Sequence, residues 1–244
     1  ITFANVLQHD VFPLPKILQM VQEYGQGEMR RPVEIEFAVT LDAMKKTGTF
    51  YLLQIRPMVD VKADLSENLN LIPEDQLLLK SYNSLGHGIM EDVYDVVYVK
   101  TDGYSASNNQ LIAYEIEKIN RKFLEEDKHY VLVGPGRWGS SDTWLGIPVK
   151  WPHISAARVI VEAGLTNYRV DPSQGTHFFQ NLTSFGVGYF TINAYMNDGL
   201  YNMDFLNAQP AVEETQFVRH VRFDKPVTIK MDGRKKVGVV MMPS

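Results

Sequence analysis

The chain contains no cysteine among its 244 residues. This absence excludes a disulfide framework, a thiolate metal site and a cysteine nucleophile, and it is typical of a reducing compartment. We therefore expect a cytoplasmic protein. No apolar run approaches the roughly 20 residues that a membrane-spanning helix needs, and no signal peptide is apparent, so we expect no membrane partner.

An excess of positive charge is also missing. The 24 Lys and Arg residues are outnumbered by 29 Asp and Glu residues, which gives a net charge of −5. A protein that follows the nucleic-acid backbone needs a positive surface, so we expect no nucleic-acid partner. The basic clusters Arg30–Arg31 and Arg234–Lys236 are short and are interpreted as solvated turn residues.

The remaining composition is that of an ordinary globular protein, with 45% hydrophobic and 22% charged residues. A polar stretch from Val59 to Gln76 has one proline and no steady period, and it indicates a connection between two parts. We predict a first part over 1–60, a linker over 61–80 and a second domain over 81–244. The chain begins with Ile rather than Met, and we expect a piece of a longer protein.

Two segments have the apolar spacing of helices. The first extends from Leu14 to Gly25, where the glycine suits a helix stop. The second, over 108–127, carries a stripe of apolar residues, and Ser107 or Asn108 can cap it. The stripe consists of Ile112, Ile116, Ile119 and Phe123.

Short runs of β-branched and aromatic residues dominate the second part, and their length favours strands. The runs cover 93–100, 130–134, 157–164, 187–195, 217–223, 227–231 and 237–242. Asp232 and Gly233, in the link between the last two runs, indicate a closing hairpin. The sequence therefore predicts an α+β protein whose second part is a β-rich β/α domain.

Two apolar runs near the start of the chain contain polar residues spaced by two. The runs are PVEIEFAV, Pro32–Val39, and FYLLQIRP, Phe50–Pro57. The polar link between them contains Gly48 and predicts an antiparallel pair. Because alternate side chains of a strand point to opposite faces, one face would gather two carboxylates, an amide and a guanidinium. These belong to Glu34, Glu36, Gln54 and Arg56.

This polar face allows two interpretations. Carboxylates suit Mg²⁺ and a planar guanidinium suits phosphate, which together predict a metal–phosphate site. The other interpretation is a half-exposed hairpin with a cross-strand Glu–Arg pair. The same alternation assigns Leu53 to the opposite, apolar face and Leu52 to the polar face.

The two motifs, in this order, resemble the end of the nucleotide-binding domain in the phosphoenolpyruvate synthase and pyruvate phosphate dikinase family. The resemblance covers the first part of the chain and implies the C-terminal portion of an ATP-grasp domain, with ATP and Mg²⁺ as cofactors. It implies that Glu36 and Glu34 hold the Mg²⁺ of Mg-ATP. It also implies that Gln54 and Arg56 contact the nucleotide phosphates. Most of the adenine pocket would then lie upstream of this chain.

The domain that follows in this family is a swivelling phosphohistidine carrier. Of the six histidines, His177 in SQGTHFFQN fits best, because it comes after a glycine and a threonine downstream of a strand. A neutral imidazole at a helix start suits phosphoryl transfer. The family motif separates Thr from His by one residue and continues with small residues, whereas here Thr176 is adjacent and Phe178 follows. The other interpretation is a structural histidine near a helix start.

The resemblance thus implies a fragment of a phosphoenolpyruvate synthase-like phosphotransferase that is inactive alone. It would act on pyruvate or phosphoenolpyruvate through domains absent from this chain. One alternative is a non-catalytic binding or regulatory module fused to an ATP-grasp remnant. Another is an acidic, β-rich interaction domain with no affinity for nucleotides.

A glycine-rich turn, Val133–Asp142, follows one of the expected strands. Its successive backbone N–H groups would suit an anion beside Arg137. It is not a P-loop, because the lysine of that motif is missing. The other interpretation is a bend that exposes Trp138.

Overall fold

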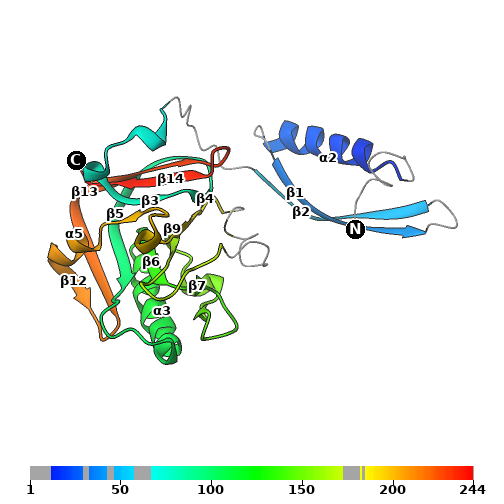
Figure 1. Cartoon of the computed structure of the whole chain (residues 1–244). Coiled ribbons are helices and arrows are strands. Elements are labelled where there is room, and N and C mark those ends of the chain that lie inside the picture. Colours follow the sequence, from blue (N-terminus) through cyan, green and yellow to red (C-terminus); the bar gives the residue numbers. More distant parts are fainter. Residues whose placement is uncertain are drawn as a thin grey trace. The chain divides into compact units, whose positions relative to one another are not determined.

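The computed structural model describes residues 12–29, 33–42, 47–57, 67–172, 182 and 185–243. The chain divides into two compact units, residues 1–60 and 61–244 (Figure 1). Within the described residues, a ten-stranded mixed sheet and three α-helices make this a mixed α/β protein. The expectation of a strand-rich protein with both helices and strands is confirmed at this level.

The first unit consists of one helix and one hairpin. Helix α2 (Leu14–Met29) contacts strands β1 (Val33–Asp42) and β2 (Thr47–Pro57). The prediction that this helix ends at Gly25 is wrong, because the helix continues to Met29. Gly25 is buried where the helix meets the hairpin, and a Cβ there would lie 2.4 Å from Ile55 Cδ1. The glycine therefore allows close packing instead of ending the helix.

The antiparallel pairing predicted for β1 and β2 is confirmed, but it contains a β-bulge. The register shifts between Glu36 and Phe37, so that Phe37 lies opposite Leu52. Leu53 is the extra residue, and an extra residue moves all following side chains to the other face. The assignment of Leu52 to the polar face is therefore wrong. Phe37 also stacks on Phe50, with ring centroids 5.2 Å apart, on the apolar face.

The second unit begins inside the segment expected to be a linker. The 3-10 helices η1 (Leu69–Leu71) and η2 (Glu74–Gln76) precede strand β3 (Leu77–Ser81), which is buried in the sheet. Leu69 and Ile72 are buried in a cluster with Leu77, Val237 and Val239. These apolar contacts join residues 69–80 to the second unit, so a linker over 61–80 extends too far.

The ten-stranded sheet combines parallel and antiparallel pairs. Its order is β11 (Leu200–Tyr201), β3, β14 (Val237–Met241), β13 (Val218–Asp232), β5 (Gly88–Val99), β6 (Tyr130–Pro135), β9 (Ala157–Ala163), β10 (Gly188–Ile192) and β4 (Asn83–Leu85), and β12 (Ala211–Glu214) pairs with β13. Strands β5, β6, β9 and β10 are parallel neighbours, and the other pairs are antiparallel. The carboxyl ends of the parallel strands therefore meet at one edge.

The sheet curls so that its two ends approach each other. Strands β3 and β4 are separated in sequence by Tyr82 alone, yet they lie near opposite ends of the strand order. Ser81 Oγ donates to the backbone oxygen of Thr191 in β10 at 2.7 Å. A Cβ on Gly238 of β14 would lie 2.3 Å from the ring of Phe190, so glycine permits this close approach.

The expected strands of the second part are present, but two of them are one. Strand β13 contains 218–223 of the first run and all of 227–231. The ladder with β5 shifts between Arg222 and Val227, and Pro226 lies within the shifted segment. Because proline has no N–H to donate, it interrupts the β-branched sequence pattern at this point, although the strand itself continues.

The closing hairpin predicted at Asp232–Gly233 is confirmed between β13 and β14. Its loop has four residues, 233–236, because Asp232 pairs with Val237. Lys236 takes the left-handed conformation, with φ of 57°. The carboxylate of Asp232 accepts the backbone N–H groups of Arg234 and Lys235.

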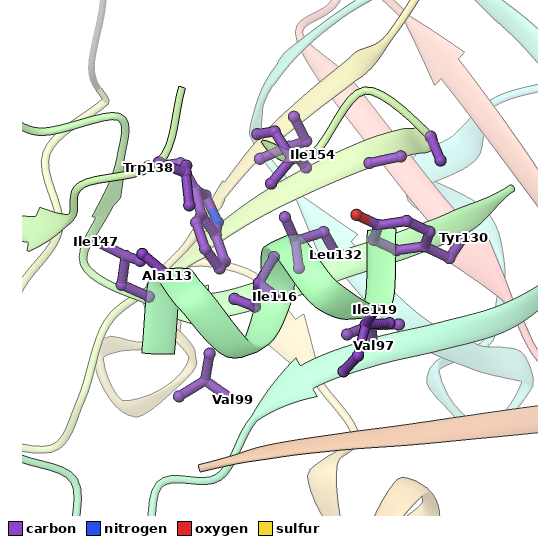
Figure 2. Close-up of a cluster of buried hydrophobic side chains, with 14 of the residues drawn as sticks. Val97, Val99, Ala113, Ile116, Ile119, Tyr130, Leu132, Trp138, Ile147 and Ile154 are labelled. Atoms are coloured by element: carbon purple, nitrogen blue, oxygen red, sulfur yellow. The ribbon is translucent and has the colours of Figure 1, made fainter. Parts of the chain in front are cut away.

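Helix α3 (Asn109–Glu125) covers one face of the sheet, and its predicted apolar stripe is buried. Figure 2 shows Ile116 of the helix near Leu132 of β6, with Trp138 and Tyr130 farther along the same cluster. Asn108 takes the N-cap position but makes no side-chain capping bond.

The other face is covered by the short helix α5 (Met203–Ala208), whose Leu206 is buried. A small separate pair, β7 (Arg137–Trp138) with β8 (Gly146–Ile147), follows β6. The remaining 3-10 helices are η3 (Ala106–Asn108), η4 (Trp151–His153) and η5 (Ala194–Met196). No helix among the described residues has the length and apolar character to cross a membrane.

Candidate functional site

The polar residues predicted to share a face of the β1–β2 hairpin do so. Glu34 lies opposite Arg56, and Glu36 lies opposite Gln54. Directly opposite residues of an antiparallel pair point to the same face, so the four form one row. Glu34, Glu36 and Gln54 are exposed to solvent. We call these four residues the polar row.

The polar row fits a magnesium ion that arrives with a nucleotide. Mg²⁺ is usually bound by one or two carboxylates together with substrate phosphates and water. Glu34 and Glu36 supply two carboxylates on one face. Across the ranges that the structure describes, no group of three or more His, Asp or Glu residues could hold a metal ion by itself. Two carboxylates on one face are a donor set that a Mg²⁺ ion already bound to phosphate can use.

The two acidic positions of the row differ in their opposite residues. Glu34 faces the basic residue Arg56 across the strands, whereas Glu36 faces the uncharged Gln54. The register therefore leaves Glu36, unlike Glu34, without a basic residue directly opposite it.

The predicted phosphoryl acceptor, His177, lies outside the described residues. Two other histidines have structural partners. His153 Nδ1 accepts the backbone N–H of Lys150 at 3.1 Å. His129 Nδ1 is 3.2 Å from the backbone oxygen of Ala156, and its Nε2 lies 2.6 Å from Arg158 Nη2.

A histidine that the sequence did not single out, His220, is paired with a buried carboxylate. Its Nε2 lies 2.7 Å from Asp95 Oδ1, and Arg222 Nη1 donates to Asp95 Oδ2 at 3.0 Å. Asp95 is 2% exposed. A ring N–H at Nε2 that donates to a carboxylate leaves Nδ1 as the basic nitrogen.

This Asp95–His220 pair borders a cavity of about 460 Å³ between α3 and β13. Lys122 at its rim pairs with Glu213, and Phe123 packs beside the imidazole with ring centroids 5.1 Å apart. Two features of the sequence hint at the pair: one acid inside the apolar run of β5, and His220 spaced by two from Arg222. Their contact depends on the pairing of β5 with β13, which local patterns do not specify.

We expect Asp95→Asn to lower the thermal midpoint of the second unit by roughly 3–12 °C. Asparagine keeps the shape but loses the charge that both His220 and Arg222 contact, and hydrogen bonds to charged groups contribute about 1.5–3 kcal/mol. Differential scanning calorimetry of the whole chain measures this shift. Asp92→Asn, an exposed site on the same strand, serves as the control. Equal midpoints for the two variants would show that the pair contributes nothing to stability.

The four consecutive backbone N–H groups of residues 136–139 are all hydrogen-bonded within the protein, so the prediction of an anion cradle there is wrong. The amides of Gly136 and Arg137 donate to the backbone oxygens of Ala163 and Leu145, each at 3.1 Å. The amide of Gly139 donates to the backbone oxygen of Ile147 at 2.9 Å. These donors hold the turn against neighbouring strands instead of facing solvent.

Trp138 in the same turn is buried, with 2% exposure, so the expectation of an exposed bend is also wrong. Its indole N–H donates to the backbone oxygen of Val161 at 2.9 Å. Its backbone N–H donates to Glu162 Oε1 at 3.0 Å, and Tyr189 Oη donates to Glu162 Oε2 at 2.5 Å. The buried carboxylate of Glu162 therefore connects the turn to β10.

Comparisons of the chain with protein-family models, with curated proteins and with solved structures found no match.

Proposed function

We propose that the chain is part of a phosphoenolpyruvate synthase-like phosphotransferase, and that the polar row binds the Mg²⁺ and phosphates of ATP. The observation that supports this is the register of β1 and β2, which pairs Glu34 with Arg56 and Glu36 with Gln54, and the exposure of Glu34, Glu36 and Gln54. A metal–phosphate site needs carboxylate and guanidinium groups side by side and accessible to the ligand. The rest of the support is the resemblance of the two motifs.

In this proposal each residue of the row has one task. Glu36 binds the metal ion with Glu34 beside it, and Gln54 and Arg56 contact phosphate oxygens. Bound Mg²⁺ neutralises charge that develops on the phosphates during transfer. A guanidinium group keeps its charge at all working pH values, so the attraction of an arginine for phosphate does not depend on a titration.

The first unit would then be the end of an ATP-grasp domain, and the second unit would occupy the position of the phosphohistidine carrier. His177 is the residue that we propose to accept the phosphoryl group and pass it to pyruvate, bound by a domain outside this chain. This step depends on the nucleotide site, because the phosphoryl donor binds there. A non-catalytic second unit remains the alternative if nucleotide binds but no histidine is phosphorylated.

The proposal predicts that Arg56→Lys weakens Mg-ATP binding by about 10- to 100-fold. Lysine keeps the charge but loses the planar pair of donors, and one hydrogen bond to a charged group contributes about 1.5–3 kcal/mol. Isothermal titration calorimetry on the full-length protein measures the affinity. Arg234→Lys in the exposed β13–β14 loop is the matched control and should bind as the wild type does.

If Arg56→Lys binds Mg-ATP as tightly as the wild type and turnover is also unchanged, Arg56 is only the cross-strand partner of Glu34. Failure of the wild-type protein to bind Mg-ATP at all would overturn the proposed function.

A further inference from the structure

An exposed tyrosine lies on the same face of the β1–β2 hairpin as the polar row. Tyr51 of β2 is directly opposite Ala38 of β1, and directly opposite residues point to the same face. Along β1, Ala38 follows Glu34 and Glu36 in steps of two, so its side chain shares their face. Tyr51 is 48% exposed, and its ring is therefore accessible to a ligand on this face.

The β-bulge at Leu53 is what turns Tyr51 to this face. Strict alternation along β2 would place Tyr51 with Ile55 on the apolar face. The extra residue reverses the faces between them, and bulges next to ligand sites often redirect a side chain in this way. A second observation agrees. Phe50 stacks on Phe37 on the apolar face, so the next residue, Tyr51, points the other way.

The spacing along β1 orders the groups on this face. The position opposite Tyr51 is two residues beyond Glu36 and four residues beyond Glu34. At about 3.4 Å per residue, these steps correspond to about 7 and 14 Å. Gln54 is opposite Glu36, and Arg56 is opposite Glu34. The aromatic ring therefore stands at one end of the row and the position of Arg56 at the other.

This order matches the order of groups in a nucleoside triphosphate. In such a molecule the base is separated from the last phosphate by the ribose and two further phosphates. Nucleic-acid bases stack on aromatic side chains, because every base has a flat π face. A tyrosine beyond the phosphate contacts supplies a surface of this kind, and the methyl group of Ala38 leaves room beside it.

We infer that Tyr51 stacks on the base of the nucleotide, with the last phosphate toward Arg56 and the ribose near Ala38. The inference rests on the proposed function, because phosphates on the polar row are what bring a base to Tyr51. It adds that the ligand is a nucleotide and not simply a polyphosphate, and that the ligand lies along the strands in one direction.

Two ligands with the same number of phosphates separate the base from the phosphates. ATP carries a base, and inorganic tripolyphosphate has none. Isothermal titration calorimetry on the full-length protein with Mg²⁺ measures both affinities. Tyr51→Ala should weaken ATP binding by about 5- to 150-fold, the effect typical of removing an aromatic stacking partner. The affinity of this variant for tripolyphosphate should equal that of the wild type.

Two further variants show whether the ring itself makes the contact. Tyr51→Phe keeps the flat ring and should bind ATP as the wild type does. Tyr24→Ala is the control, because Tyr24 is 73% exposed on α2 of the same unit. It should bind both ligands with wild-type affinity. If ATP binds but tripolyphosphate is too weak to measure, a loss in Tyr51→Ala that Tyr51→Phe does not share still supports the inference.

Other outcomes overturn the inference and leave the proposed function standing. One is wild-type ATP affinity in Tyr51→Ala. Another is equal weakening of ATP and tripolyphosphate, which would mean that Tyr51 only stabilises the hairpin. A loss in Tyr51→Phe as large as that in Tyr51→Ala would assign the contact to the hydroxyl and not to stacking. Failure of the wild type to bind either ligand is a different result, because it overturns the proposed function itself.

Discussion

If the polar row binds Mg-ATP as proposed, Glu36→Ala should lower the Mg²⁺-dependent ATP turnover of the full-length protein by at least about 100-fold, and Glu34→Ala should lower it much less. Residues that hydrogen-bond to a metal ligand typically contribute 10- to 100-fold to metal affinity or activity. Loss of a residue that itself binds the metal should lower activity by at least as much. The difference between the two acids follows from the register, since Arg56 stands opposite Glu34 but no basic residue stands opposite Glu36. Steady-state turnover at several Mg²⁺ concentrations measures both effects.

Glu91→Ala is the matched control for this pair, because Glu91 is an exposed acid on β5 in the other unit. It should retain wild-type turnover. Full activity in both Glu36→Ala and Glu34→Ala would remove the metal assignment. Equal losses would contradict the charge argument but leave a role for the polar row.

Trp138→Ala is expected to cause the largest loss of stability, lowering the thermal midpoint of the second unit by about 6–20 °C. Truncation of a buried tryptophan costs about 3–5 kcal/mol, and each kcal/mol corresponds to about 2–4 °C in a domain of this size. The ring is 2% exposed, lies in the cluster under α3 and donates to the backbone of Val161 (Figure 2). Calorimetry of the whole chain measures the change.

The chain supplies a close control for this substitution. Trp144 belongs to the same turn region but is 72% exposed, so Trp144→Ala should shift the midpoint by no more than a degree or two. If both variants melt at the same temperature, Trp138 does not anchor the turn. A large loss for Trp144→Ala alone would contradict the burial of Trp138.

The sequence predicted elements whose patterns are local. The stripe of α3 and the β-branched runs of β5, β6 and β9 identified these elements because each pattern repeats along its own segment. The bulge at Leu53 could not be found in this way, since one extra residue leaves the composition of β2 unchanged while reversing its faces. The helix stop predicted at Gly25 is wrong for a related reason. This glycine allows close packing against Ile55, which belongs to β2 and not to the helix.

The same division holds for the candidate sites. The polar row was predictable because its residues are spaced by two along each strand and a single turn joins the two strands. Asp95 and His220 are 125 positions apart, and only the pairing of β5 with β13 joins them. The face to which Tyr51 points depends on the bulge at Leu53, which no local pattern encodes.

The curled sheet has a consequence for how the second unit folds. Strand β14 lies between β3 and β13, although it comes after all the other described strands in the sequence. During synthesis on the ribosome, the edge of β3 and the edge of β13 that pair with β14 therefore remain unpaired until β14 emerges. Pairings between distant segments form slowly, and exposed strand edges favour aggregation. Chaperone binding to the nascent chain should consequently persist until the last hairpin is complete.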